Sequence, residues 1–218
     1  MIADHRFVRA AAARISEAAD STCAALAEGL IRNPHTFTDR LLRRTAKELD
    51  RFRSHDLRWR AQAFVDKNAD GAFVADIVGS LEVDLPDYAV RKGFLARTLF
   101  LANGRPPTHD ELDELRLACT VMLAVSPASY VFVYKPTGVI VVPATAVVGS
   151  VGRPDRLHRR QIGRFYEEHF SCFIGDPRIT GTKAVPLEEL ARQNRARTGL
   201  ALHVEPASTP RQESLFRR

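Results

Sequence analysis

Three carboxylates fall on one predicted strand over residues 73–85. Alternation along FVADIVGSLEVDL places Asp76, Glu82 and Asp84 on one face, while the other face is apolar. Carboxylates on one face repel one another unless a cation, a basic partner or water compensates their charge. Oxygen ligands of this kind suit Mg²⁺, which keeps several of its own waters. The pattern therefore fits either a magnesium site, with Asp76 and Glu82 as ligands, or a charged face in solvent.

The sequence around this strand resembles a known superfamily. The resemblance lies within residues 36–176, in the segments TDRLLRR, LRW, ADIVGSLEVDLPDYAVRKGFLA, SPASYVFVYKPTGVIVVPATAVVG and RFYEEHFSCFIGD. These are similar to bacterial proteins of the PD-(D/E)XK superfamily, which implies a restriction-endonuclease-like fold. Members place an Asp on the second core strand, and an acid or Gln, any residue and then Lys on the next. The acids hold Mg²⁺, and the metal and the Lys activate a water that attacks a phosphodiester.

Two motif positions carry residues that cannot perform this chemistry. By the resemblance, Asp76 matches the core Asp, and Asp70 stands where an upstream acid often lies. Arg97 then occupies the acid or Gln position, and Leu99 occupies the Lys position. Arg97 is a permanently charged donor that cannot ligate a cation, and Leu99 cannot polarise a water. We expect Arg97 to form an ion pair with Asp76 in place of the metal.

Another lysine could restore the centre only by a change of strand register. Lys92 has the opposite parity from Leu99, so it should point to the other face of the sheet. A β-bulge at Gly93 would reset that register. The literal Pro86-Asp87 pair imitates the family motif, but it fits ordinary turn chemistry between two strands.

Two clusters of basic residues are candidate contacts to nucleic acid. The chain has a net charge of +6 and a pI of about 9.6, which favours anionic partners. Basic side chains in a helix or a loop can contact a phosphate backbone, although a solvated helix face or an acidic protein partner explains them as well. The candidates are Arg40, Arg43, Arg44 and Lys47 in a predicted helix, and Arg153, Arg156, Arg159 and Arg160 in a loop.

His169 and Cys172 lie three residues apart on one face of a further predicted helix. Zinc would need two more ligands at recognisable spacing, and the sequence offers none nearby. Packing of Phe165, Phe170 and Phe173 in the core explains the segment better. We therefore expect a structural helix at this place.

The remaining pattern predicts an α/β (α+β) fold, with a mixed central sheet flanked by helices. We expect an N-terminal helical extension (1–35), a restriction-endonuclease-like domain (36–198) and a C-terminal tail (199–218). Periodicity predicts helices over 6–30, 37–52, 108–123, 162–174 and 185–197, and strands over 57–65, 73–85, 90–101, 129–134 and 139–143. Thr108 and Glu111 are placed to form a capping box.

The cysteine spacing and the hydropathy indicate the compartment in which the protein is expected. Three widely spaced cysteines, with no Cys-x-x-Cys pair, argue against a disulfide framework and fit a reducing compartment. The N-terminus lacks the apolar core of a secretory signal, and no run of about 18 apolar residues occurs. We expect a cytoplasmic protein with no membrane partner.

These observations favour a catalytically degenerate protein with a nuclease fold and no cofactor. Such a protein would bind nucleic acid, with DNA as the favoured partner, or it would serve as an assembly subunit. Its setting would be a bacterial defence or mobile-element system. The setting follows from the resemblance alone. Two alternatives stay open, namely an active Mg²⁺-dependent DNA or RNA endonuclease with a displaced lysine, and a scaffold that binds a protein partner or a second copy of itself.

Overall fold

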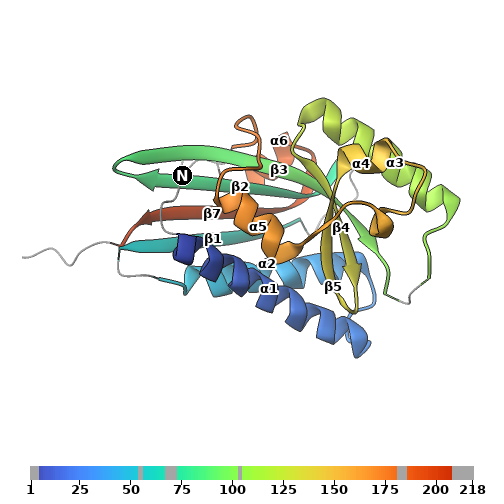
Figure 1. The fold of residues 1–218 in the computed structure, drawn as a ribbon, viewed down its shortest axis with the longest axis horizontal. Helices are drawn as coiled ribbons and strands as arrows, with labels where there is room; N and C mark the ends of the chain where they lie inside the picture. The colour runs from blue at the N-terminus through green and yellow to red at the C-terminus, as the bar shows by residue number, and fades with distance from the viewer. Residues whose placement is uncertain (1–4, 54–55, 67–72, 103–104, 181–185, 208–218) are drawn as a thin grey trace, which may run out of the picture.

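A computed structural model describes residues 5–53, 56–66, 73–102, 105–180 and 186–207 (Figure 1). The chain forms a mixed β-sheet flanked by helices, as predicted. In chain order its elements are α1 (His5–Ala27), α2 (Pro34–Asp50), β1 (Leu57–Val65), β2 (Ala75–Leu85), β3 (Tyr88–Phe100), α3 (His109–Val125), β4 (Ser129–Lys135), β5 (Gly138–Pro143), α4 (Ala144–Val148), the 3-10 helix η1 (Pro154–Arg156), β6 (Arg160–Gln161), α5 (Ile162–Phe170), α6 (Leu187–Gln193) and β7 (Ala196–Pro206).

The strands are ordered β1-β7-β2-β3-β4-β5-β6 across the sheet. β2 and β3 form an antiparallel hairpin, and α3 connects β3 to the parallel strand β4. The last strand, β7, returns between β1 and β2 and runs parallel to β2. The predicted tail over 199–218 is therefore wrong in its first part, because Leu200, Leu202 and Val204 are buried in the core.

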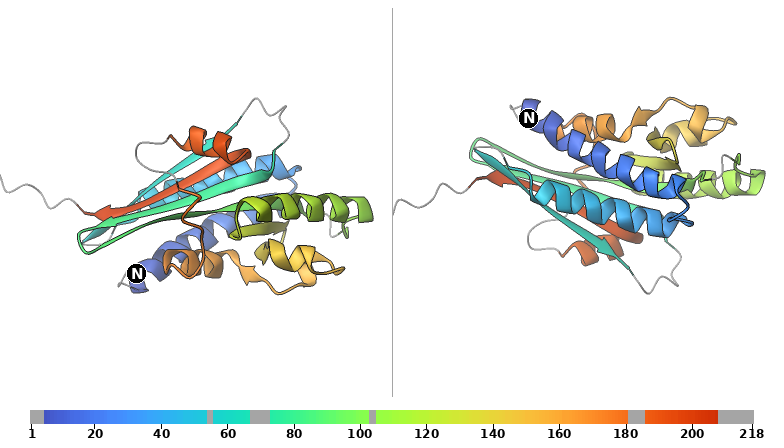
Figure 2. Two further views of the ribbon diagram at one scale, coloured as in Figure 1. Left: turned by 90° about the horizontal axis from the view of Figure 1, so that it is seen from above. Right: turned by 90° about the horizontal axis from the view of Figure 1, so that it is seen from below.

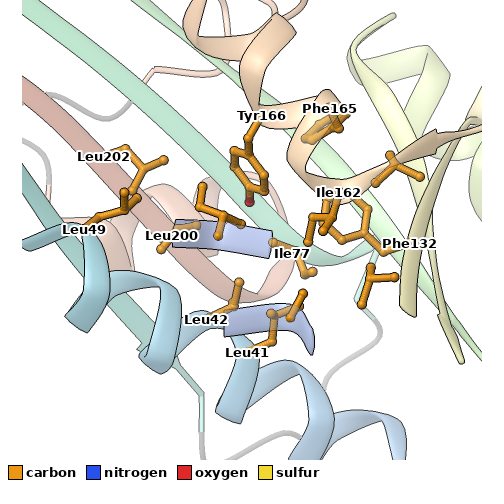
Figure 3. Packing of buried hydrophobic residues seen from close by; sticks show 14 of the residues in the cluster. Leu41, Leu42, Leu49, Ile77, Phe132, Ile162, Phe165, Tyr166, Leu200 and Leu202 are labelled. Carbon is orange, nitrogen blue, oxygen red and sulfur yellow. The ribbon is translucent and has the colours of Figure 1, made fainter. Parts of the chain in front are cut away.

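Two sets of helices pack on the two apolar clusters of the sheet. Helices α1 and α5 lie on the opposite side of the sheet from α6 (Figure 2). Helices α1, α2 and α5 enclose one apolar cluster, in which Leu41 and Leu42 lie near Ile77 and the Phe165 ring lies farther along, toward Phe132 (Figure 3). Helices α3, α4 and α6 cover the other face. Because α1 contributes buried residues such as Ile15 to the first cluster, it is part of the core and not the separate extension that was predicted.

Local signals define the starts of the two helices beside the candidate site. The side chain of Asn33 accepts a hydrogen bond from the Thr36 amide at 2.8 Å, and Pro34 lies in the first turn of α2. Thr108 and Glu111 form the predicted capping box at the start of α3. These caps fix where the chain enters α2 and α3, whose first turns flank the end of β3.

Candidate functional site

Asp76, at the start of β2, is held by three hydrogen bonds from β3. Arg97 Nη1 donates to Asp76 Oδ1 at 3.3 Å. The Thr98 amide and hydroxyl donate to Asp76 Oδ2 at 2.7 and 2.8 Å. The ion pair is largely buried, since 20% of the Arg97 side chain and 14% of the Asp76 side chain are exposed. The predicted pairing of Arg97 with Asp76 is confirmed.

The lysine position of the motif is part of the apolar core. Leu99 lies on the same face of β3 as Arg97 and packs in the cluster under α3 and α4. Lys92 does not replace it. The β2–β3 pairing runs without a bulge from Leu85–Tyr88 to Ile77–Ala96, and it places Lys92 opposite Leu81. Lys92 therefore lies on the other face, as its parity predicted.

Asp76 and Glu82, the metal ligands expected if the site were active, do not lie close enough to share one ion. The two residues lie six apart on β2, a separation of about 20 Å along a strand. Glu82 instead accepts a hydrogen bond from Arg91 at 2.9 Å and lies 3.2 Å from the imidazole of His203. No group of three or more His, Cys, Asp or Glu within the described ranges is arranged to hold a metal. Asp70 lies outside those ranges.

A groove with a volume of about 720 Å³ opens beside the Asp76–Arg97 pair. It lies between the α1–α2 connection, the end of β3 and the start of α3, and its volume is typical of ligand sites. Arg32, Arg97 and Arg105 line it, together with Glu111 and Glu114. Its apolar lining consists of Leu26, Ile31, Pro34, Leu99, Phe100, Leu101, Ala102, Pro107 and Leu115. Because two carboxylates oppose three guanidinium groups, the groove is only weakly cationic.

A smaller pocket of about 120 Å³ includes Asp76 and residues from α2 and β7. The Thr198 hydroxyl donates to the Asp76 carbonyl at 2.6 Å, which fixes β7 against β2. Arg197 Nη1 lies 2.6 Å from His35 Nε2. Burial first, and then the charge of Arg197, lower the pKa of His35. Both effects favour the neutral imidazole, which can accept a hydrogen bond from Arg197.

Sequence reasoning missed the cations around Asp76 that come from distant parts of the chain. Arg32 and Arg105 lie in connections, where no periodicity indicates a direction. Arg197 falls in a segment that was predicted to be helical, whereas it lies on β7. The alternation of Leu200, Leu202 and Val204 was the available signal for that strand.

The basic cluster on α2 lies toward solvent, which fits both a contact to nucleic acid and a solvated helix face. Arg40 and Lys47 are exposed and Arg44 is half-buried, and in the part of the chain that the structure describes none of the three forms an ion pair. Arg43 pairs with Asp39 one turn earlier. Arg40, Arg44 and Lys47 recur at positions i, i+4 and i+7, so these three cations line one side of the helix.

The basic loop before α5 is partly neutralised within the chain. Arg153 pairs with Asp155 at 3.0 Å, and Arg160 pairs with Glu168 at 2.5 Å. Arg156 and Arg159 are exposed, and Arg159 Nη1 donates to the Asp155 carbonyl at 3.0 Å. The loop contacts β4 and β5, whereas α2 packs over β1 at the opposite side of the sheet. The two predicted clusters therefore do not form one surface.

A comparison with protein-family models, curated proteins and solved structures found no match for this chain. A search of the described helices for a membrane span also found none, because none of them is sufficiently long and apolar. The evidence for the α/β architecture and for the Asp76–Arg97 ion pair is the structure of the chain itself.

Proposed function

We propose that this chain is a non-catalytic protein of the restriction-endonuclease-like type that binds nucleic acid. Two features support the fold assignment. Asp76 lies on the second strand and Arg97 and Leu99 on the third, as the resemblance implies, and α3 joins that third strand to the parallel β4. The position of β7 between β1 and β2 is a feature that the resemblance does not imply.

The main support for a protein without catalytic activity is the ion pair between the Arg97 guanidinium and the Asp76 carboxylate. A divalent cation would have to displace a buried positive charge and the hydrogen bonds from Thr98. Among the described residues Asp76 belongs to no group of three or more His, Cys, Asp or Glu side chains, and Mg²⁺ is held poorly without several oxygen ligands. With Leu99 in the lysine position, no side chain is available there to activate a water.

We expect the wild-type protein to leave duplex DNA and single-stranded RNA uncut in Mg²⁺ or Mn²⁺. The assay compares wild type, Asp76→Ala and the double variant Arg97→Gln/Leu99→Lys by gel electrophoresis. Leu99 lines the groove, so a lysine introduced there can extend into solvent. Metal-dependent cleavage by the double variant alone would support the proposal. Robust wild-type cleavage that Asp76→Ala abolishes would refute it.

Binding is proposed to use the row of cations on α2. This helix begins beside the Asp76 site, where His35 and Thr38 line the smaller pocket. Arg40, Arg44 and Lys47 continue from that end along the helix, and none of the three forms an ion pair with another described residue. Each cation that contacts a phosphate releases about one counterion, so binding should weaken steeply as salt increases.

The triple variant Arg40→Gln/Arg44→Gln/Lys47→Gln should bind DNA at least about tenfold more weakly. The slope of log K against log salt should fall by about 3, because three phosphate contacts are lost. Fluorescence anisotropy with a labelled duplex, in EDTA and at several salt concentrations, measures both quantities.

The matched control is Arg14→Gln/Arg116→Gln/Arg192→Gln, which removes the same total charge from other surface helices. Each of these arginines pairs with an exposed or half-exposed carboxylate on its own helix. The control should bind within about twofold of wild type. Equal losses in both triple variants would show that α2 has no special role, and no binding by wild type would favour a protein scaffold.

A further inference from the structure

Large apolar side chains that remain exposed gather on two neighbouring helices. Among the described residues seven such side chains are exposed, and five of them lie on α3, on α4 or just after α4, namely Leu117, Val121, Val125, Val148 and Val151. Helix α4 packs against α3. The other two are Leu30 and Phe173, and Phe173 is 72% exposed, so its predicted place in the core is wrong. A single exposed apolar side chain is ordinary, whereas a gathered set marks an interaction surface.

The exposed face of α3 changes from acidic to apolar along the helix. Asp113, Leu117, Val121 and Val125 recur every four residues, which places them in one row on the helix surface. The exposed fractions of the three apolar members are 66%, 40% and 42%. The opposite face of α3 is buried in the apolar cluster beneath the helix. The second half of α3 is therefore apolar on both faces.

Two small side chains beside this row complete an uncharged surface. Thr120 and Ala124 are exposed next to Val121. The Thr120 hydroxyl donates to the Arg116 carbonyl at 2.9 Å, so its hydrogen bond is made within the helix. A surface helix normally carries charged or polar residues on its outer face. An outer face without them is typical of a helix that another protein surface covers.

The two ends of the row carry opposite charges. At its start, 74% of the Asp113 side chain and 77% of the Glu114 side chain are exposed. At its other end, the Ser126 hydroxyl donates to Asp176, to which Arg178 is also bonded. The Arg178 side chain is 64% exposed. The surface thus begins with carboxylates, continues with apolar side chains and ends near a guanidinium.

We propose that two copies of this chain associate through α3, in an antiparallel arrangement about a twofold axis at Val121. A twofold contact brings the same patch of both copies together. Leu117 of each copy then packs against Val125 of the other, because both lie four residues from the axis. The acidic start of each α3 lies toward the Arg178 end of the other copy, whereas a parallel pair would place like charges together. The cations proposed to bind nucleic acid lie on α2 and are not part of this contact.

Sedimentation velocity of the full-length protein, in reducing buffer without nucleic acid, measures the association. We expect a reversible monomer–dimer equilibrium with a Kd on the order of 10 µM, because the contact is limited to α3 and its neighbour α4. Val121→Glu brings two like charges together at the axis and should weaken the association at least about tenfold. A protein that stays monomeric up to about 200 µM would overturn the proposal.

The matched control is Leu30→Glu, which adds the same charge at an apolar side chain that is 67% exposed outside this surface. This control should leave the Kd within about twofold of wild type. Both changes lie at exposed positions, and circular dichroism checks that each variant is folded. Equal weakening by the two variants would show that the row on α3 has no special role.

Disulfide cross-linking tests the antiparallel arrangement. Single cysteines are introduced at Val121 or at Asp113 in a Cys172→Ser background, in which the remaining Cys23 and Cys119 are buried. With oxidised glutathione, Val121→Cys should form a covalent dimer. Asp113→Cys should form it at least about tenfold more slowly, because its two copies would lie about 24 Å apart. Equal rates, or no cross-link at Val121 in a protein that sediments as a dimer, would refute a twofold axis at this residue.

Discussion

The Arg97→Met variant is expected to lose about 3 kcal/mol of its free energy of unfolding, because the change leaves the Asp76 carboxylate largely buried without its cation. Methionine retains the length and apolar character of the arginine stem, so the effect isolates the charge. The Thr98 amide and hydroxyl still bond to Asp76, which keeps the loss below that of a fully isolated buried charge. Chemical denaturation of wild type and variant measures the difference.

A double-mutant cycle separates the ion pair from the packing of Arg97. Asp76→Asn in the Arg97→Met background should recover about 2 kcal/mol, because the unpaired charge is then removed. Arg116→Met is the matched control. Its partner Asp113 has 74% of its side chain exposed, so this change should cost less than about 1 kcal/mol. A loss in Arg97→Met no larger than that of the control would contradict a structural ion pair at Asp76.

The Asp76–Arg97 pair was predictable because a strand has a side-chain period of two. Parity alone placed Asp76 on one face of β2, and the short turn between β2 and β3 brought Arg97 to the neighbouring position on β3. The same reasoning correctly excluded Lys92 from the site. Local signals likewise gave the capping box of α3 and the buried strands β4 and β5.

Features that depend on long-range pairing could not be predicted in this way. The place of β7 between β1 and β2 is set by contacts across more than 100 positions of sequence, such as the hydrogen bond from Thr198 to Asp76. The approach of Arg197 to His35 follows from that placement. The meeting of Cys172 with Tyr88 depends in turn on how α5 packs over β3. Residue types suggested candidates at these places, but only the sheet order decides which of them meet.

Asp176 connects its own loop to β3 through its backbone and to the end of α3 through its buried carboxylate. Its backbone amide and carbonyl bond to Gly93 on β3, at 2.8 and 2.9 Å. The Ser126 hydroxyl, at the end of α3, donates to its Oδ2 at 2.7 Å. Arg178 donates to both carboxylate oxygens, and only 3% of Asp176 is exposed. The hydrogen bonds from Arg178, with that from Ser126, lower the pKa of Asp176 to about 2.

The Asp176→Asn variant should therefore lose about 2 kcal/mol of stability at pH 7, since the folded state binds the proton more weakly than the unfolded chain does. The ionised Asp176 carboxylate contributes its full stabilisation at pH values above 3.8, the ordinary pKa. That stabilisation is lost as the pH falls toward 2, the pKa in the folded state. The difference between wild type and variant should be constant down to about pH 5 and fall to about half at pH 3. Urea denaturation at several pH values measures it, with Asp113→Asn as an exposed control. A difference independent of pH between 5 and 3 would mean that Asp176 acts through its hydrogen bonds and not through its charge.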